Sequence, residues 1–358
     1  MSPLSIAFFG SSLVSSYWNG AATYYRGLIR NLHQLGHRVT FYEPDAYDRQ
    51  SHRDIENPEW ATVVVYPTTE EGVFRSLAAA RGSDLVVKAS GVGVFDDLLE
   101  EEVLSLKGEA TQVIFWDVDA PATLARIREN RKDPFRDLIP RYDLVLTYGG
   151  GDPIVKAYRS FGAVECIPVY NALDPETHFP VPPEPRYRAD LSFLGNRLPD
   201  REHRVEDFFL SVAEHLPDRR FLLAGSGWDD KQRGSNVSYL GHLGTRDHNV
   251  FNCSPIAVLN ISRVSMAQNG FSPATRVFEA AGAGACIITD RWEGIDHFFE
   301  PDQEILVAGS GSEVAEILER LSPEKAAAIG ARALTRVRAE HTYAHRARQF
   351  EAIFANGK

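Results

Sequence analysis

The sequence predicts an α/β protein made of two doubly wound parallel-sheet domains that face each other across a cleft. Short apolar runs alternate with helix-like segments along both halves of the chain, a pattern typical of parallel strands joined by crossover helices. The alternation stops near Ile167, at a proline-rich stretch, and then starts again. The 358 residues also exceed the usual size of a single hydrophobic core. We therefore expect each half to bury a core of its own.

The first half opens with a strand, a helix and a second strand. An apolar run at 4–10 ends in glycine, a helical apolar pattern covers 21–35, and the segment 36–41 ends that helix and begins the second strand. Further apolar runs follow at 62–65, 85–88, 113–116 and 144–147. The run at 4–10 has no basic segment before it and is too short to cross a bilayer, so we expect a first strand and a cytoplasmic protein.

A proline-rich segment divides the chain. Five prolines lie so close together that they exclude a helix or a central strand; they are Pro175, Pro180, Pro182, Pro183 and Pro185. We expect a first domain at 1–171, a linker at 172–188, a second domain at 189–340, and a C-terminal helix at 341–358 that returns to the first domain. In the second domain, strands are predicted at 191–194, 221–224, 237–240, 257–260, 285–289 and 305–307.

Composition and charge restrict the class of partner. Hydrophobic residues make up 44% of the chain and charged residues 24%, which is typical of a globular protein and not of a disordered or membrane protein. A formal charge of -11 would repel a phosphate backbone, so we expect a small partner and no extended nucleic-acid surface. The three cysteines, expected in the core, and the mostly surface histidines have no metal-ligand spacing, so we expect no metal site.

Candidate functional residues follow the predicted strands, because ligands of open parallel sheets bind beyond the carboxyl ends of the strands. In the loop at 10–20, Gly20 directly precedes the first predicted helix. The N-terminus of a helix carries unpaired N–H groups and partial positive charge, which favour an anion. The alternative is a long connection that ends in a glycine turn.

A second candidate site begins at Ser272, which we expect to cap a helix that has Pro273 at its first position. Three backbone amides would then face a phosphate; they belong to Ala274, Thr275 and Arg276. Glu279 shares a helical face with Thr275 and Arg276, so its carboxylate can accept both hydroxyls of a ribose. The alternative is an ion pair between Glu279 and Arg276 at the surface.

Three polar residues follow the first strand of the second domain, namely Asn196, Arg197 and Arg201. Arginine makes bidentate contacts with phosphate oxygens, so Arg197 or Arg201 can neutralise a leaving diphosphate, with Arg204 as a further candidate. The alternative for each of these arginines is that it is simply solvated at the surface.

Two aspartates end a strand of the first domain. Asp117 and Asp119 are spaced by two, so both side chains point to the same side of an extended chain and can serve an acceptor hydroxyl as base or hydrogen-bond partner. Asp119 also precedes Ala120 and Pro121, which suits the N-cap of the following helix. Both interpretations remain open.

Nearly the whole chain resembles the CgeB-like glycosyltransferases, named for a spore-maturation protein, and more distantly the glycogen-synthase-type retaining enzymes of the GT-B architecture. The resemblance is carried by Gly20, by 36–39, by 171–174 with Phe179 and Pro180, by 225–227, and by 272–284. It implies a GT-B fold in which the second domain binds a nucleotide-diphosphate sugar and the first domain binds the acceptor.

The resemblance also implies residue roles. Arg201 matches the second basic residue of the pair that holds the donor diphosphate, and the first falls on Asn196 or is displaced to Arg197. Gly225 lies in a matched donor-binding loop, and Glu279 matches the ribose-binding glutamate. A carboxylate eight residues before that glutamate falls on Phe271 here, which departs from the pattern. The position at which such enzymes often carry a histidine that faces the reacting sugar falls near Asp117 and Asp119.

The predicted function is therefore transfer of a sugar, of the hexosyltransferase type, from a nucleotide sugar to an unidentified acceptor hydroxyl. Asp119, Asp117 and Arg201 are the candidate catalytic residues. The resemblance implies a retaining reaction, and neither a metal nor another cofactor is expected, because arginines and a helix N-terminus can take the place of magnesium. Two rivals remain: a nucleotide-sugar epimerase, and a non-catalytic or structural binding protein that keeps the fold.

Overall fold

The computed structural model describes residues 2–355, so the ends of two predicted segments, residue 1 and residues 356–358, lie outside the described part. The chain forms two compact units. The first unit holds residues 2–171 together with 343–355, and the second holds 172–342, which includes the segment predicted as a linker. Within residues 2–355, no helix is both long enough and apolar enough to cross a membrane.

The first unit is built on a parallel sheet of seven strands in the order β3-β2-β1-β4-β5-β6-β7. Its strands are β1 (Ser5–Phe9), β2 (Arg38–Pro44), β3 (Thr62–Tyr66), β4 (Leu85–Ala89), β5 (Gln112–Asp117), β6 (Leu144–Thr147) and β7 (Cys166–Pro168). The strand order runs outward from β1 in both directions, as in a doubly wound fold. This confirms the fold predicted for the first half.

Helices cover this sheet on both faces. They are α1 (Ala22–Gln34), α2 (Glu70–Ala80), α3 (Asp96–Glu102), α4 (Ala120–Glu129), α5 (Phe135–Leu138), α6 (Asp152–Ser160) and α14 (Tyr343–Ala355). In β1, Ala7 and Phe9 belong to the core under α2–α6, whereas Phe8 stacks on Phe41 on the other face. The alternation along β1 therefore supplies two cores, one on each side of the sheet.

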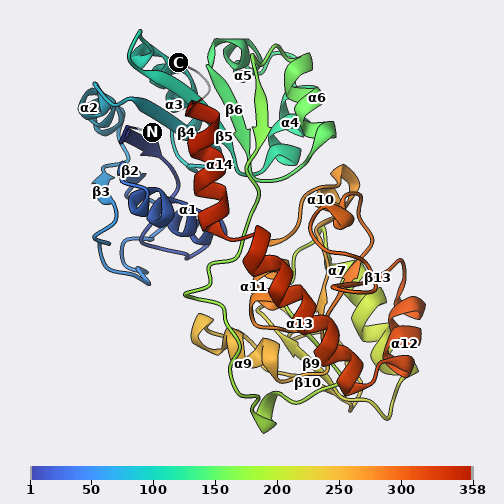
Figure 1. Cartoon of the computed structure of the whole chain (residues 1–358). Helices are drawn as coiled ribbons and strands as arrows, with labels where there is room; N and C mark the ends of the chain where they lie inside the picture. Colours follow the sequence, from blue (N-terminus) through green and yellow to red (C-terminus); the bar gives the residue numbers. More distant parts are fainter. Residues whose placement is uncertain (1, 356–358) are drawn as a thin grey trace. The chain divides into compact units, whose positions relative to one another are not determined.

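The last helix packs against the first one. Figure 1 shows α14, drawn in red, beside α1, drawn in dark blue. A Cβ atom on Gly27 would lie 2.1 Å from the Tyr343 ring, so only glycine leaves room for that aromatic side chain. Phe350 stacks on Trp116 of β5, with ring centroids 5.6 Å apart, and Arg346 Nε donates a hydrogen bond of 3.1 Å to the Tyr170 carbonyl.

Strand β7 was not predicted from the sequence. It has three residues, ends in Pro168 and pairs only with β6 at the edge of the sheet. An edge strand tolerates proline because one side of its ladder needs no donor.

The cysteines were all expected in the core. Cys166 is buried in β7, as expected, but the expectation is wrong for Cys253, which is half-buried and donates a hydrogen bond to the Ala283 carbonyl.

The second unit repeats the doubly wound plan with six parallel strands in the order β10-β9-β8-β11-β12-β13. The strands are β8 (Leu191–Leu194), β9 (Phe221–Ala224), β10 (Val237–Tyr239), β11 (Ala257–Asn260), β12 (Ile287–Asp290) and β13 (Leu306–Ala308). All six lie within two residues of their predicted positions, which confirms the second parallel-sheet domain.

The helices of the second unit are α7 (Glu202–Val205), α8 (Ser211–His215), α9 (His248–Cys253), α10 (Val264–Asn269), α11 (Thr275–Gly282), α12 (Gly311–Arg320) and α13 (Pro323–Glu340). A π-helical turn at Glu206–Leu210 joins α7 to α8. On one face of the sheet, Phe193, Phe209 and Trp228 belong to a single buried cluster. The start of α7 and the start of α11 are the segments that carry most of the predicted donor-binding residues.

Candidate active site

Arg201 lies in the loop between β8 and α7. Its Nη2 atom donates a hydrogen bond of 2.5 Å to the Asn196 carbonyl, and its guanidinium lies over the Phe193 ring, 5.6 Å from the centroid. The Nε atom is buried without a hydrogen-bond partner among the described residues. Burial, and then the positive charge of Arg276, lower the pKa of Arg201 to about 10. A buried donor without a partner beside a second cation suits an anionic ligand.

Arg276 and Glu279 lie three residues apart on α11, on one helical face as predicted. The Nη1 atom of Arg276 is buried and has no hydrogen-bond partner within residues 2–355. The Glu279 side chain is 13% exposed. The two residues therefore do not form the surface pair that was the alternative interpretation.

Helix α11 begins later than the sequence predicted. Ala274, with φ -63° and ψ 146°, is extended and occupies the N-cap position, so Thr275 is the first helical residue. The prediction that Ser272 caps this helix is wrong; its Oγ atom is buried without a hydrogen-bond partner in the described part of the chain. Phe271, at φ 45°, donates its N–H to the Glu293 carbonyl at 2.6 Å. This hydrogen bond to a distant loop fixes the conformation of the segment before the helix. Local capping preferences cannot reveal such a contact.

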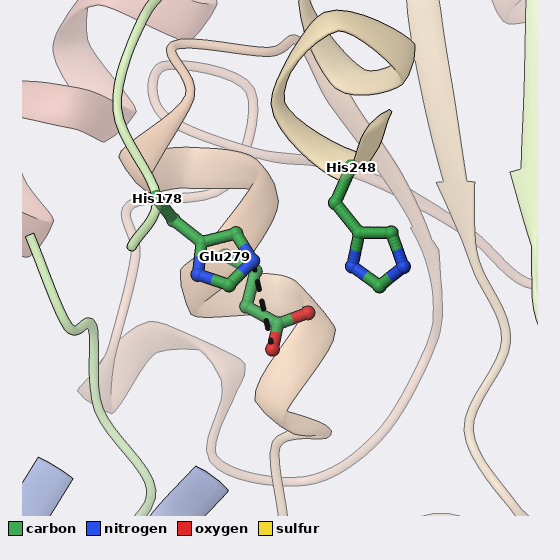
Figure 2. A group of neighbouring side chains, drawn as sticks. All are labelled: His178, His248 and Glu279. Carbon is green, nitrogen blue, oxygen red and sulfur yellow. Dashed lines mark ion pairs between the residues drawn. The ribbon is translucent and has the colours of Figure 1, made fainter. Parts of the chain in front are cut away.

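Two histidines that the sequence did not single out lie beside Glu279. Figure 2 shows His178, from the proline-rich segment, and His248, the first residue of α9, on either side of the Glu279 carboxylate. The Nε2 atom of His178 is 3.9 Å from Oε1 of Glu279. The two imidazole rings have centroids 6.2 Å apart.

Burial and charge determine the protonation states of this group. Burial acts to raise the pKa of Glu279, but His178, Arg276 and His248 outweigh it and leave that pKa below its usual value. Burial, and then the charge of Arg276, lower the pKa of His248 to about 4. At neutral pH, Glu279 is therefore an anion and His248 is uncharged.

His248 follows β10 by one loop, so the rule that ligands bind beyond the carboxyl ends of strands also covers it. Applying that rule to every strand would have found this histidine. No comparable signal marks His178, because it is brought to Glu279 by the path of an irregular segment and not by a motif.

Arg197 is engaged with carboxylates of its own unit. Its Nη2 lies 2.7 Å from Glu202, and its Nη1 lies 2.6 Å from Asp230. Hydrogen bonds to Glu202 and Asp230 raise the pKa of Arg197. Arg204 is likewise paired with Asp290 at 2.6 Å. A diphosphate would have to displace these pairs, whereas it would meet an unpartnered donor at Arg201.

Asn196 and Gly225 hold two loops together. Asn196 Oδ1 accepts a hydrogen bond of 3.0 Å from the Ser226 N–H. Gly225 has φ 121°, and a Cβ atom there would lie 2.2 Å from the Gly195 carbonyl oxygen. Only glycine allows so close an approach of the loop after β9 to the loop after β8. These predicted donor-binding residues thus shape the loop that carries Arg201.

The remaining predicted residues lie in the first unit. Asp117 is fully buried, and four donors surround its carboxylate: Ser90 Oγ at 2.8 Å, Asp119 N at 3.0 Å, Thr123 Oγ1 at 3.0 Å, and Tyr158 Oη. Burial raises its pKa. This carboxylate connects β5 to α4 and α6 and is not presented at the surface of its unit.

Asp119 occupies the N-cap position of α4, and its side chain makes no capping hydrogen bond within the described residues. It is half-buried, whereas Gly20, at the start of α1, is exposed. The structure thus places Arg276 within electrostatic reach of both Arg201 and Glu279 in the second unit, and it places Asp119 and Gly20 in the first unit.

Comparisons with known proteins agree with this fold. Residues 201–352 match the family model described as "Glycosyl transferase-like". No curated protein sequence matches the chain.

Several solved structures are similar over nearly the whole length. Anabaena HepE in complex with UDP-glucose is 14% identical, with a TM-score of 0.66 and coverage of 99% of this chain and 100% of that chain. Sucrose-phosphate synthase from Thermosynechococcus elongatus is 13% identical, with a TM-score of 0.69 and coverage of 99% and 98%. An alpha-glucosyltransferase in complex with UDP-glucose and DNA containing an abasic site is 12% identical, with a TM-score of 0.72 and coverage of 99% and 100%.

At such identities the structural likeness establishes the fold alone. The two parallel-sheet units have the GT-B fold of solved glycosyltransferases, and residues 201–352 are glycosyl transferase-like in sequence.

Proposed function

We propose that the protein transfers a sugar from a nucleoside diphosphate donor to an acceptor hydroxyl, with retention of configuration and without a metal ion. The observation that carries this proposal is the group formed by Arg201, Arg276 and Glu279 in the second unit. Arg201 and Arg276 each have a buried guanidinium nitrogen without a partner among the described residues, and the charge of Arg276 acts on both Arg201 and the anionic Glu279.

Each member of the group has a part in donor binding. The two guanidinium groups would donate hydrogen bonds to the diphosphate, where negative charge grows as the bond to the sugar breaks. Glu279 is acceptor-only when ionised, so it suits two ribose hydroxyls. Two positive charges held in a buried position can supply the electrostatic stabilisation that a magnesium ion gives in other enzymes.

The bond changes of the transfer are simple. The bond between the anomeric carbon and the diphosphate oxygen breaks, and a bond from that carbon to the acceptor oxygen forms. The acceptor hydroxyl loses its proton to a base, for which Asp119 is the candidate in the first unit. The diphosphate leaves with the electron pair, held by Arg201 and Arg276.

The first donor to test is UDP-glucose, because the solved structures of Anabaena HepE and of the alpha-glucosyltransferase contain it. We propose in addition that the chain is related to the CgeB-like enzymes, on the residues that carry the resemblance. Phe271 stands where the retaining pattern has a carboxylate, so the hydroxyls of the sugar would have to be held by other groups.

Calorimetry with the full chain tests donor binding. We expect UDP and UDP-glucose to bind, and Arg276→Ala to weaken UDP binding by about tenfold or more. Arg186→Ala is the matched control, because Arg186 is an exposed arginine of the same unit, paired with Glu184. Equal affinities in Arg276→Ala and wild type would remove Arg276 from the donor site.

A second assay separates transfer from the rival functions. Purified protein is incubated with UDP-glucose and a panel of hydroxyl acceptors, and the anomeric signals are followed by NMR. A new glycoside supports transfer, and its anomeric coupling reports retention or inversion. Formation of a free epimer without acceptor would instead indicate an epimerase, and binding without any turnover would indicate a binding protein.

A further inference from the structure

The side chains of His178, His248 and Glu279 form a compact group of potential metal ligands in the second unit (Figure 2). One ligand atom from each residue lies within 4.8 Å of the other two. Zinc bonds to nitrogen and oxygen of about 2.0 Å place tetrahedral ligands roughly 3.3 Å apart. The ligand atoms would therefore need to approach one another by up to about 1.5 Å to bind a common ion.

His178 shows that this group is more than a chance cluster. Its side chain is 4% exposed, and its Nε2 atom, which faces Glu279, has no hydrogen-bond partner in the described part of the chain. Its Nδ1 atom lies 2.9 Å from the Thr177 hydroxyl. If Nδ1 donates its proton to that hydroxyl, the lone pair is on Nε2. A partner on one ring nitrogen that frees the other is the usual outer-shell support of a metal-binding histidine.

We propose that His178, His248 and Glu279 bind a divalent transition-metal ion, and that the bound ion keeps the nucleotide away from Glu279. The metal site is independent of the proposed function, whereas the exclusion of the nucleotide rests on it. The ion is an inhibitor here and takes no part in transfer, because the carboxylate that would bind the ribose is occupied by the metal. Free metal would then regulate donor binding by competition for one side chain.

The donor set selects the class of metal. Two imidazoles and one carboxylate suit zinc and its neighbours, whereas magnesium prefers oxygen ligands and keeps several waters. Three protein ligands also leave at least one position of a tetrahedral ion open. A zinc salt is therefore the positive probe, and a magnesium salt is the negative probe.

Arg276 is expected to have opposite effects on zinc binding and on nucleotide binding, which a purely structural residue would not have. Its positive charge acts on both His248 and Glu279, so it favours an anionic nucleotide and opposes a cation. Replacing Arg276 with glutamine should tighten zinc binding, by about tenfold, while it weakens UDP binding. The two ligands should respond to one substitution in opposite directions.

The experiment is a calorimetric titration of zinc chloride into the full chain after treatment with a chelator, at pH 7.5. We expect one ion per chain, and His248→Ala should weaken binding by about thirtyfold or more. His203→Ala is the matched control, because this histidine of α7 is 94% exposed and should change the affinity less than about twofold. His248→Gln, which preserves side-chain volume better, replaces His248→Ala if circular dichroism shows that the alanine variant is unfolded.

Zinc binding equal in wild type and the His248 variant, or equal binding of magnesium and zinc, overturns the site. Because UDP itself binds zinc, competition is measured at a fixed free-zinc concentration set by a metal buffer. Zinc should lower the UDP affinity of wild type more than that of the His248 variant. Equal losses of UDP affinity in wild type and the His248 variant would overturn the proposal that the ion competes with the nucleotide for Glu279.

The outcomes also separate this proposal from the proposed function. Zinc binding without nucleotide binding would leave the metal site standing and remove the donor site. Nucleotide binding without zinc binding would leave the donor site standing and remove the metal site.

Discussion

The Nη2 atom of Arg201 donates a hydrogen bond to the Asn196 carbonyl at 2.5 Å, while Nε of the same guanidinium has no partner within residues 2–355. One side of the group is thus fixed to its own loop, and the other is left for a ligand. A preorganised donor of this kind acts most strongly where charge develops during the reaction. Arg201 is therefore expected to contribute more to turnover than to donor affinity.

Arg201→Ala should lower kcat by about a hundredfold or more and change donor affinity less. Steady-state kinetics and calorimetry of the same preparation measure the two effects. Arg197→Ala is the companion variant, and it should have the smaller effect because Arg197 is paired with Glu202 and Asp230. An increase in KM alone would contradict the role given to Arg201.

Glu279→Gln should weaken UDP binding by about 1 to 3 kcal/mol, because an amide replaces an acceptor-only carboxylate opposite the two ribose hydroxyls. Calorimetry with inorganic diphosphate is the control, since diphosphate has no ribose and should lose little affinity. Equal losses for UDP and diphosphate would mean that Glu279 acts through the arginines and not through the ribose.

Asp119→Asn should leave UDP-glucose binding intact and reduce transfer by about a hundredfold or more, because asparagine cannot accept the proton. Asparagine is about as good as aspartate at the N-cap position that Asp119 occupies, so the free energy of unfolding should not change by more than about 0.5 kcal/mol. Near-normal transfer in this variant would remove Asp119 as the base.

Tyr158→Phe should destabilise the first unit by about 1 to 3 kcal/mol, because it leaves an oxygen of the buried Asp117 carboxylate without its donor. Urea denaturation measures the loss. Tyr47→Phe is the control, since Tyr47 is 55% exposed and its hydroxyl, bonded to the Gly93 carbonyl, can exchange that bond for water. Similar losses in the two variants would argue against a structural role for the Asp117 network.

Glu100 predicts a pH dependence of stability. Burial raises its pKa to about 7, against the opposing charges of Lys88 and Arg126. Because the folded-state pKa lies above the unfolded value, the stability that Glu100 contributes is full below about pH 4.5 and is lost as the pH rises through about 7. Glu100→Gln mimics the protonated form. Its free energy of unfolding, relative to that of wild type, should increase by up to about 3 kcal/mol between pH 5 and pH 8.

Urea denaturation at pH 5, 6, 7 and 8 follows this difference. A gap between the two proteins that stays constant with pH would show that Glu100 does not titrate in this range.

The sequence was sufficient for the parts of the fold that depend on local patterns. Strands such as β1 and β8 are short, mostly apolar runs, and both were predicted within one residue of their observed bounds. Strand β7 is too short to produce a pattern, and its pairing depends on β6. The start of α11 was missed for a related reason, because the Phe271 N–H is bonded to the distant Glu293 carbonyl.

The candidate site divides in the same way. Arg201, Arg276 and Glu279 follow strands in the sequence, and the carboxyl-end rule was enough to select them. His178 was not selected, because its position depends on the path of a segment without regular structure. The resemblance could not supply it either, since the pairing of His178 with Glu279 becomes visible only when the chain is folded.

The position of α14 also determines when each unit can finish folding during synthesis. The second unit is complete once residue 342 has left the ribosome, and its Leu173 then pairs with Thr342 at its own two ends. The first unit begins earlier but still lacks the helix that carries Tyr343 and Phe350, so the aromatic face beside Gly27 and Trp116 stays uncovered. The unit that starts first is therefore the one that closes last, and its unfinished face is the stretch of nascent chain most in need of protection from aggregation.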